Sequence, residues 1–177
     1  MNELLADDHA ELGNLLGKVF AALDADEVAL SHASLDLFWA RLAVHIRAEH
    51  LHVFPAVENA FDETHTKGLS AGEALKVIEE LRSDHDFFMS ELSEAVVITR
   101  NLVKSVDRQA DVQRLQHVRA KVATVEARLA KHNRVEEEGV YLWTSSLLSE
   151  TEQTALAARV QKELENMPPR FGIRSTS

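Results

Sequence analysis

The chain has 177 residues, 45% of them hydrophobic, which is enough for one domain with a substantial core. Its formal net charge of -10 argues against general electrostatic binding to nucleic acid or to anionic lipid. The absence of cysteine excludes disulfides, thiolate metal ligands and cysteine nucleophiles, so the nine histidines become the informative residues.

Apolar residues at helical spacing, together with few Gly, Pro and β-branched runs, predict five helices. In chain order, we expect one helix over residues 2–23 and a second from about Ser31 to about Ala60. A third should begin at the capping-box pattern Ser70–Glu73 and carry apolar residues to Val103, and a fourth, capped by Asp107, should carry them to Trp143. A shorter fifth helix should begin at a second capping box, Ser149–Glu152, and end before Pro168. Pro55 should kink the second helix or loosen its hydrogen bonding.

These elements predict an all-α fold. Four long helices with short connections bury four apolar stripes most naturally as an antiparallel up-down four-helix bundle. The short fifth, C-terminal helix should pack across one end of this bundle. No linker indicates a second domain, so we expect one domain over residues 1–167 and a flexible tail over residues 168–177.

The sequence also predicts where the protein works. No apolar run approaches the roughly 20 residues that span a bilayer. The N-terminal stretch MNELLADDHAEL has acidic residues where a secretory signal peptide has basic ones. We therefore expect a cytoplasmic protein that binds neither a membrane nor nucleic acid, while its protein partner and its oligomeric state stay open.

Each predicted long helix carries polar residues within its own apolar stripe. Four histidines and two glutamates occupy these positions: His9, His45, Glu49, His85, His132 and Glu136. A histidine and a glutamate four residues apart lie on one face of a helix, roughly 5–6 Å from each other. A buried carboxylate is costly unless it is paired or bound to metal. We therefore expect the six side chains to converge in the middle of the bundle.

A weak internal repeat relates the two halves of the chain. The stretch ADDHAELGNLL (6–16) resembles RSDHDFFMSEL (82–92), and HIRAEHLHVF (45–54) resembles HNRVEEEGVY (132–141). Each half supplies one lone histidine and then a His-x-x-x-Glu pair. The halves can therefore pack with pseudo-two-fold symmetry, which is what a two-metal centre needs.

Imidazole with carboxylate suits iron, manganese or zinc. Two divalent ions would offset the cost of burying both glutamates, with two histidine nitrogens and one oxygen from each bridging carboxylate on each ion. A solvent-derived oxygen could bridge as well, and one position would stay open to a small ligand. The alternative to a metal site is a hydrogen-bonded polar core, since a single histidine within an apolar stripe or a single His-x-x-x-Glu pair is common. Two matching copies favour metal.

The remaining polar candidates have weaker patterns. We expect His52 to lie off the site on the surface, although it could support a ligand, and we place the remaining histidines on the surface by default: His32, His50, His65 and His117. Glu137 or Glu138 could replace Glu136 as a ligand if the helix is locally distorted, and otherwise they form a solvated acidic run. Tyr141 and Trp143 are expected to be packing residues, although an aromatic near a diiron site can carry oxidising equivalents.

The pattern resembles the hemerythrin-like domains, also called hemerythrin HHE cation-binding domains. The stretches that carry the resemblance are DDHAEL, HIRAEHLHVFP, SDHDFF and HNRVEEEGVYLW, and they place it over about residues 3–147. The resemblance implies an antiparallel four-helix bundle with a non-haem diiron centre. It assigns His9 and His45 to one iron, His85 and His132 to the other, and Glu49 and Glu136 to bridges between them.

Members of this family bind dioxygen, respond to oxygen or nitric oxide, sense iron, or help to repair iron–sulfur centres. The chain departs from oxygen-carrying hemerythrins at Met89, where they have a second histidine. Two histidines per iron look more like the subgroup linked to nitrosative stress and repair, whose extra cysteine-containing module this cysteine-free chain lacks. His50 stands where many members have Glu, and Leu142-Trp143 stands where an aromatic-Pro pair is usual.

Three functions stay open on the sequence alone. The first is a diiron protein that binds dioxygen or nitric oxide at a His4Glu2 centre, for sensing, storage or the response to oxidative or nitrosative stress. The second is a diiron enzyme that reduces nitric oxide or peroxide or supports iron–sulfur repair. The third is a metal-free or zinc-bound structural bundle that binds another protein.

Overall fold

The computed structural model describes residues 2–63, 71–105 and 108–171, and all regular structure in these ranges is helical. In chain order the elements are α1 (Asn2–Asp24), α2 (Val28–Ala48), a π-helical turn η1 (Glu49–Val53), α3 (Phe54–Glu63), α4 (Ala71–Leu102), α5 (Arg108–Val135), a second π-helical turn η2 (Glu136–Val140), α6 (Tyr141–Leu147), α7 (Glu150–Leu164) and the 3-10 turn η3 (Pro169–Phe171). The all-α prediction is therefore confirmed for the described residues.

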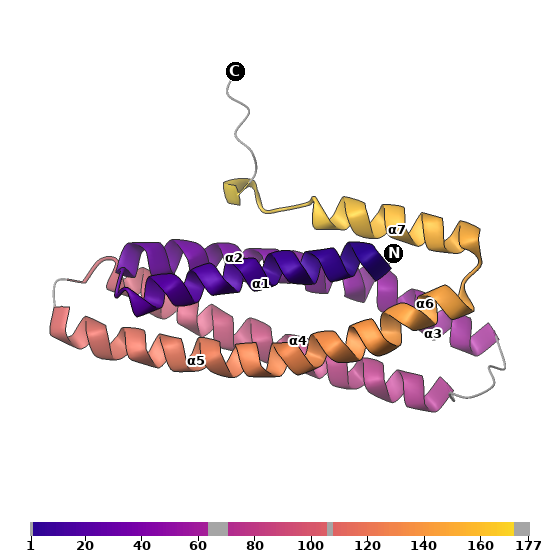
Figure 1. Ribbon diagram of the computed structural model, residues 1–177, viewed down its shortest axis with the longest axis horizontal. Coiled ribbons are helices and arrows are strands. Elements are labelled where there is room, and N and C mark those ends of the chain that lie inside the picture. Colours follow the sequence, from indigo (N-terminus) through magenta and orange to yellow (C-terminus); the bar gives the residue numbers. More distant parts are fainter. Residues whose placement is uncertain (1, 64–70, 106–107, 172–177) are drawn as a thin grey trace, which may run out of the picture.

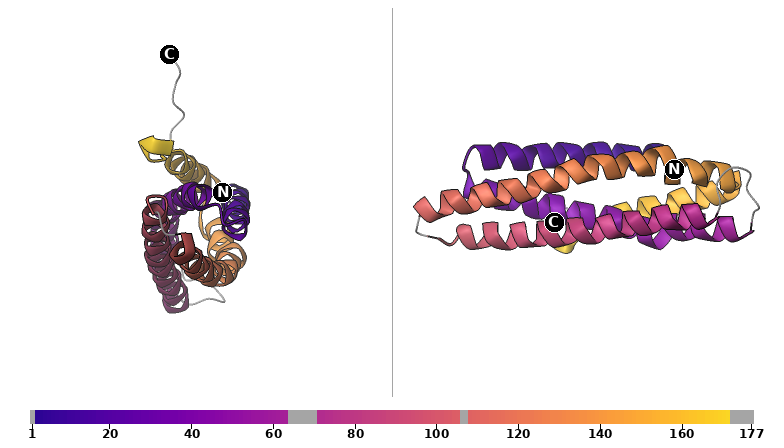
Figure 2. Two further views of the ribbon diagram at one scale, coloured as in Figure 1. Left: turned by 90° about the vertical axis from the view of Figure 1, so that its left-hand side faces the viewer. Right: turned by 90° about the horizontal axis from the view of Figure 1, so that it is seen from below.

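Four long rods make up the body of the molecule (Figure 1). They are α1, the continuous run α2–η1–α3, α4, and the continuous run α5–η2–α6. The end-on view in Figure 2 shows them surrounding a common interior. Helix α1 contacts α2 and α5, α4 contacts α2 and α5, and α3 contacts α6.

The prediction that the fifth helix packs across one end of the bundle is wrong, because α7 runs along the outside of α2 and η1 (Figure 1). Two contacts of α2 explain this placement. Arg41 donates a hydrogen bond to the carbonyl oxygen of Leu164 (3.3 Å), and Arg47 pairs with Glu163. The apolar face of α7, which carries Leu156, Val160 and Leu164, is buried against the outside of the rods.

The capping box that was predicted at Ser149 is confirmed. The Ser149 hydroxyl accepts a hydrogen bond from the Glu152 N–H, and the Glu152 carboxylate accepts one from the Ser149 N–H. Helix α7 ends at Leu164, before Pro168, as expected. The predicted caps at Ser70 and Asp107 and the tail beyond residue 171 lie outside the described residues.

Pro55 lies just after η1, and the helix does loosen at this point, as predicted. In η1 the N–H of Phe54 donates to the carbonyl oxygen of Glu49, five residues back. Because proline has no N–H, the helix cannot keep the usual hydrogen bond at Pro55. The second π turn lacks a proline, yet the N–H of Tyr141 donates in the same way to Glu136. Proline is therefore not required for this distortion.

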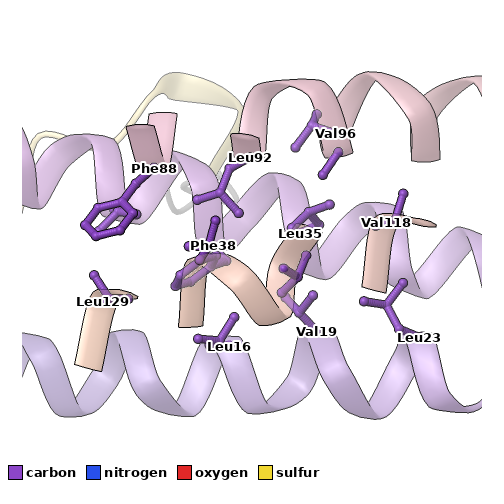
Figure 3. Close-up of a cluster of buried hydrophobic side chains, with 14 of the residues drawn as sticks. Leu16, Val19, Leu23, Leu35, Phe38, Phe88, Leu92, Val96, Val118 and Leu129 are labelled. Carbon is purple, nitrogen blue, oxygen red and sulfur yellow. The ribbon is translucent and has the colours of Figure 1, made fainter. Parts of the chain in front are cut away.

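Two apolar clusters fill the interior, one on each side of a polar layer. The first joins α1, α2, α4 and α5, and Figure 3 shows its side chains, among them Leu16, Val19, Leu35, Phe38, Phe88, Leu92, Val118 and Leu129. The second joins the other end of the bundle to α7, and it includes Leu5, Val53, Phe54, Val57, Ile78, Val140, Tyr141, Leu156 and Val160. Among the described helices, none combines the length and the hydrophobicity that a bilayer span requires.

Candidate metal centre

All six predicted side chains meet in the layer between the two apolar clusters. They form two overlapping groups in which the possible ligand atoms lie within 4.8 Å of one another: His9, His45, Glu49 and Glu136 in one, and Glu49, His85, His132 and Glu136 in the other. Every one of these side chains is buried, and both glutamates are 0% exposed. Four rods thus bring six potential ligands together in the buried interior.

The histidines form two pairs. The Nε2 atoms of His9 and His45 are 3.1 Å apart, and those of His85 and His132 are 2.9 Å apart. Each pair joins two different rods. We call them the His9/His45 position and the His85/His132 position.

The two glutamates lie between these positions, with one oxygen toward each. Oε1 of Glu49 is 3.5 Å from Nε2 of His45, and its Oε2 is 3.3 Å from Nε2 of His85. Oε2 of Glu136 is 3.3 Å from Nε2 of His9, and its Oε1 is 3.0 Å from Nε2 of His132. This is the arrangement that two bridging carboxylates would have.

Both glutamates begin a π-helical turn. A π turn spends five residues where an α turn spends four, so the fifth residue after each glutamate returns to the site. That residue is Phe54 after Glu49 and Tyr141 after Glu136. The Phe54 ring stacks on His85 with centroids 5.9 Å apart, and the Tyr141 ring lies 5.7 Å from that of His9. The distortion thus adds one aromatic wall to each position.

Tyr141 is more than the packing residue that the sequence predicted. Its hydroxyl donates to Oε1 of Glu49 at 2.6 Å and lies 3.3 Å from both Oε2 of Glu136 and Nε2 of His9. The prediction from a regular α-helical period missed this contact because it did not include the extra residue of the π turn. Trp143 does pack, edge-on against Phe61.

The other ring nitrogen, Nδ1, of each candidate-ligand histidine also has a partner. Nδ1 of His45 lies 2.7 Å from Asp8, and Nδ1 of His132 lies 3.1 Å from Asp84. Nδ1 of His9 lies 2.7 Å from Glu137, and Nδ1 of His85 lies 2.9 Å from His50. A carboxylate at Nδ1 holds the proton there and leaves Nε2 as a lone pair that points into the site. The default surface placement of His50 is therefore wrong, because this half-buried ring contacts His85.

In each half, an arginine pairs with the aspartate that contacts a histidine Nδ1. Arg41 pairs with Asp8, and Arg128 pairs with Asp84 at 2.6 Å. The sequence held a signal for them, since the internal repeat extends back from the histidines: ARLAVHIRAE (40–49) and ARLAKHNRVE (127–136) share seven of ten residues. Each arginine stands four residues before its histidine, one helical turn away, and each aspartate directly precedes a lone histidine.

The other histidines stay outside the cluster. His52 is half-buried and belongs to neither metal-ligand group. His117 is exposed, as expected, whereas His32 is half-buried and its Nδ1 lies 3.2 Å from the Thr99 hydroxyl. His65 lies outside the described residues. Glu138 is exposed, in keeping with a solvated acidic run.

The buried carboxylates of the cluster favour positive charge beside them. Burial and the Glu136 carboxylate raise the pKa of Glu49, but the charge of His45 and the close contacts of His45 and His85 with this carboxylate outweigh them and hold that pKa at about 2. Burial lowers the pKa of His85, but the nearby Glu136 and Glu49 carboxylates raise it to about 9. Two ionised carboxylates at the centre of a core thus favour the protonated forms of His45 and His85 when no other cation is near.

The residues present fit metal ions. Two imidazole lone pairs about 3 Å apart repel each other unless a cation lies between them. Two nitrogens bound at right angles to one ion, each about 2.1 Å from it, would stand about 3.0 Å apart, close to both observed separations. Oε2 of Glu49 and Oε1 of Glu136 are also buried without a hydrogen-bond partner. Such orphaned oxygens are expected where a ligand atom awaits an ion.

A helical bundle with a buried histidine and glutamate cluster belongs to a class of proteins that hold metal ions between facing helices. A comparison with protein families matches residues 1–143 to the Hemerythrin HHE cation binding domain. The match covers most of the 177 residues, so the chain belongs to this family. Neither the comparison with curated proteins nor that with solved structures returned a match.

Proposed function

We propose that this chain is a non-haem diiron protein, in which an antiparallel four-helix bundle formed within residues 1–167 holds two iron ions. In this proposal His9 and His45 bind one ion, His85 and His132 bind the other, and Glu49 and Glu136 bridge them, together with an oxo or hydroxo group. The observation that carries it is the pair of glutamates with one oxygen toward each histidine pair. Membership of a cation-binding family supports it independently.

The proposed ligand is dioxygen or nitric oxide, and the proposed role is sensing, storage or the response to oxidative or nitrosative stress. A bound diiron pair supplies an open coordination position and electrons to such a ligand. The chain contributes a buried polar layer between two apolar clusters, and such surroundings favour a small uncharged ligand over an ionic one. Four imidazoles against two carboxylates favour mild chemistry over high-valent iron.

A second candidate is a diiron enzyme that reduces nitric oxide or peroxide or supports iron–sulfur repair. The Tyr141 hydroxyl favours it, because reduction of nitric oxide or peroxide would consume protons and this hydroxyl is a buried donor within 3.3 Å of three site residues. We propose that the Tyr141 hydroxyl donates a hydrogen bond at the His9/His45 position. Turnover that is lost in Tyr141→Phe, with metal content unchanged, would distinguish the enzyme from the binding protein.

To test the ligand assignment, the iron-loaded protein is reduced and kept free of oxygen, and nitric oxide or air is then added. We expect a change in the visible spectrum with at least one of the two, and reversal when the gas is removed. His132→Ala should lose this response because it removes an imidazole from one position. His117→Ala is the matched control, since His117 is exposed. Iron-loaded protein that responds to neither gas would contradict the assignment.

A further inference from the structure

The two halves of the site repeat each other closely, but they differ at two corresponding positions. The residue directly after the glutamate is His50 in one half and Glu137 in the other. The fifth residue after it is Phe54 in one half and Tyr141 in the other. Because the arginines, aspartates, histidines and glutamates all match, these two differences alter the surroundings of one metal position relative to the other.

The first difference changes charge. Glu137 follows Glu136 on the rod that carries His132, but it supports the His9/His45 position, where its Oε1 lies 2.7 Å from Nδ1 of His9. His50 supports the His85/His132 position, where its Nε2 lies 2.9 Å from Nδ1 of His85. An ionised carboxylate makes the imidazole that donates to it a stronger electron donor than a neutral ring does. The His9/His45 position thus has two anionic partners, Asp8 and Glu137, and the other position has only Asp84.

The second difference changes support for the bridges. The Tyr141 hydroxyl bonds the oxygen of Glu49 that faces the His9/His45 position. An oxygen that accepts this bond still has a lone pair for a metal, and such bonds fix the orientation of ligating carboxylates. Phe54 offers no hydroxyl on the opposite side, where Oε2 of Glu49 and Oε1 of Glu136 have no hydrogen-bond partner.

Access differs as well. A surface cavity of about 300 Å³ is lined by His132 and Asp84, together with Val135 and Arg128. Asp84 is itself 23% exposed, whereas its counterpart Asp8 is 3% exposed and held by Arg41. Solvent therefore reaches Asp84 more readily than Asp8, while Glu137, the other anionic partner of the His9/His45 position, is itself 44% exposed.

We propose that the two metal positions are inequivalent: the His9/His45 position binds its ion first and tightly, and the His85/His132 position, supported by His50 and Phe54 beside the cavity, binds its ion second and releases it more readily. This inference rests on the proposed metal centre. Outer partners of ligating histidines are each worth about 10- to 100-fold in metal affinity. The two binding steps should therefore differ by at least about tenfold.

The test is calorimetric titration of the metal-free, full-length chain with Zn²⁺, a redox-inert probe. The native chain should show two resolved steps. His50→Glu gives both positions the same partners at Nδ1, so it should tighten the second step about tenfold or more and bring the two together. Glu137→His should weaken the first step by a similar factor. Glu138→His makes the same change of charge one residue away at an exposed position, and it should leave both steps as they are.

The chain's single tyrosine reports which position fills first. Fluorotyrosine labelling gives one ¹⁹F resonance, from Tyr141, which lies at the His9/His45 position. One equivalent of paramagnetic Co²⁺ should displace or broaden this resonance strongly. When one equivalent of Zn²⁺ is added before the Co²⁺, the effect should be much smaller, because the Co²⁺ then enters the farther position.

The outcomes separate the two proposals. Two Zn²⁺ ions that bind in unresolved steps, with His50→Glu and Glu137→His behaving like the native chain, would overturn the inequivalence and leave the metal centre standing. A ¹⁹F response that does not depend on the order of addition would also overturn it. A chain that binds neither Zn²⁺ nor Fe²⁺ would overturn the metal centre itself. Circular dichroism of each variant verifies that a lost step does not reflect unfolding.

Discussion

Replacement of Glu136 by leucine is expected to abolish binding at both metal positions. One Glu136 oxygen lies 3.3 Å from Nε2 of His9 and the other lies 3.0 Å from Nε2 of His132, so a single substitution removes a ligand atom from each group. Loss of an outer partner alone costs about 10- to 100-fold in metal affinity, and loss of a shared ligand should cost more than about 100-fold at each position. Metal analysis after anaerobic loading with Fe²⁺ measures the effect.

The control for this substitution is Glu138→Leu, two residues along the same π turn. It makes the same chemical change, but Glu138 is exposed and belongs to neither ligand group. We expect Glu138→Leu to load metal like the native chain. If Glu136→Leu also retained both ions, the assignment of Glu136 as a bridge would be wrong, and a polar core without a bridging role would explain the cluster better.

Removal of metal is expected to cause the largest change in stability. An ion that binds only the folded state stabilises it by about 4 kcal/mol when the free ion is at about 1,000 times its Kd. For a chain of this length, each kcal/mol moves the midpoint of thermal unfolding by about 2–4 °C. Two ions should therefore raise the midpoint by more than about 10 °C. Calorimetric scans of the iron-loaded protein, before and after a chelator, measure this shift.

The physical reason is the charge at the centre of the bundle. Without metal, the cluster relies on protons held by buried imidazoles, such as that of His85, whose pKa is raised to about 9. Metal ions would neutralise Glu49 and Glu136 more completely and bind four nitrogens at once. Glu136→Leu should show no effect of the chelator. A native chain that melts at the same temperature with and without chelator would contradict a resident metal pair.

The helices and the six clustered side chains could be predicted because each depends on a periodic pattern. A polar residue within an apolar stripe must point into the core, so His9 and His85 could be placed there from spacing alone. The path of α7 could not, because it depends on single contacts such as that of Arg41 with Leu164. An amphipathic helix fits against any apolar groove, and its pattern does not state which one.

The supporting residues were harder to predict for a different reason. Tyr141 and Phe54 reach the site only because each π turn adds a residue, and the hydrophobic period does not reveal a change in backbone hydrogen bonding. His50 and Glu137 adjoin Glu49 and Glu136 in sequence, but they contact histidines of other rods. Such contacts depend on how helices pack, and composition and spacing do not specify that.

The most direct test of the central claim is the metal content of the purified protein, measured together with its visible absorption before reduction, after reduction, and after return to air. We expect about two irons per chain and charge-transfer bands of a bridged iron pair that bleach on reduction and return in air. Protein that holds no iron and cannot be loaded with it, or that holds only zinc, would contradict a diiron centre at these six residues.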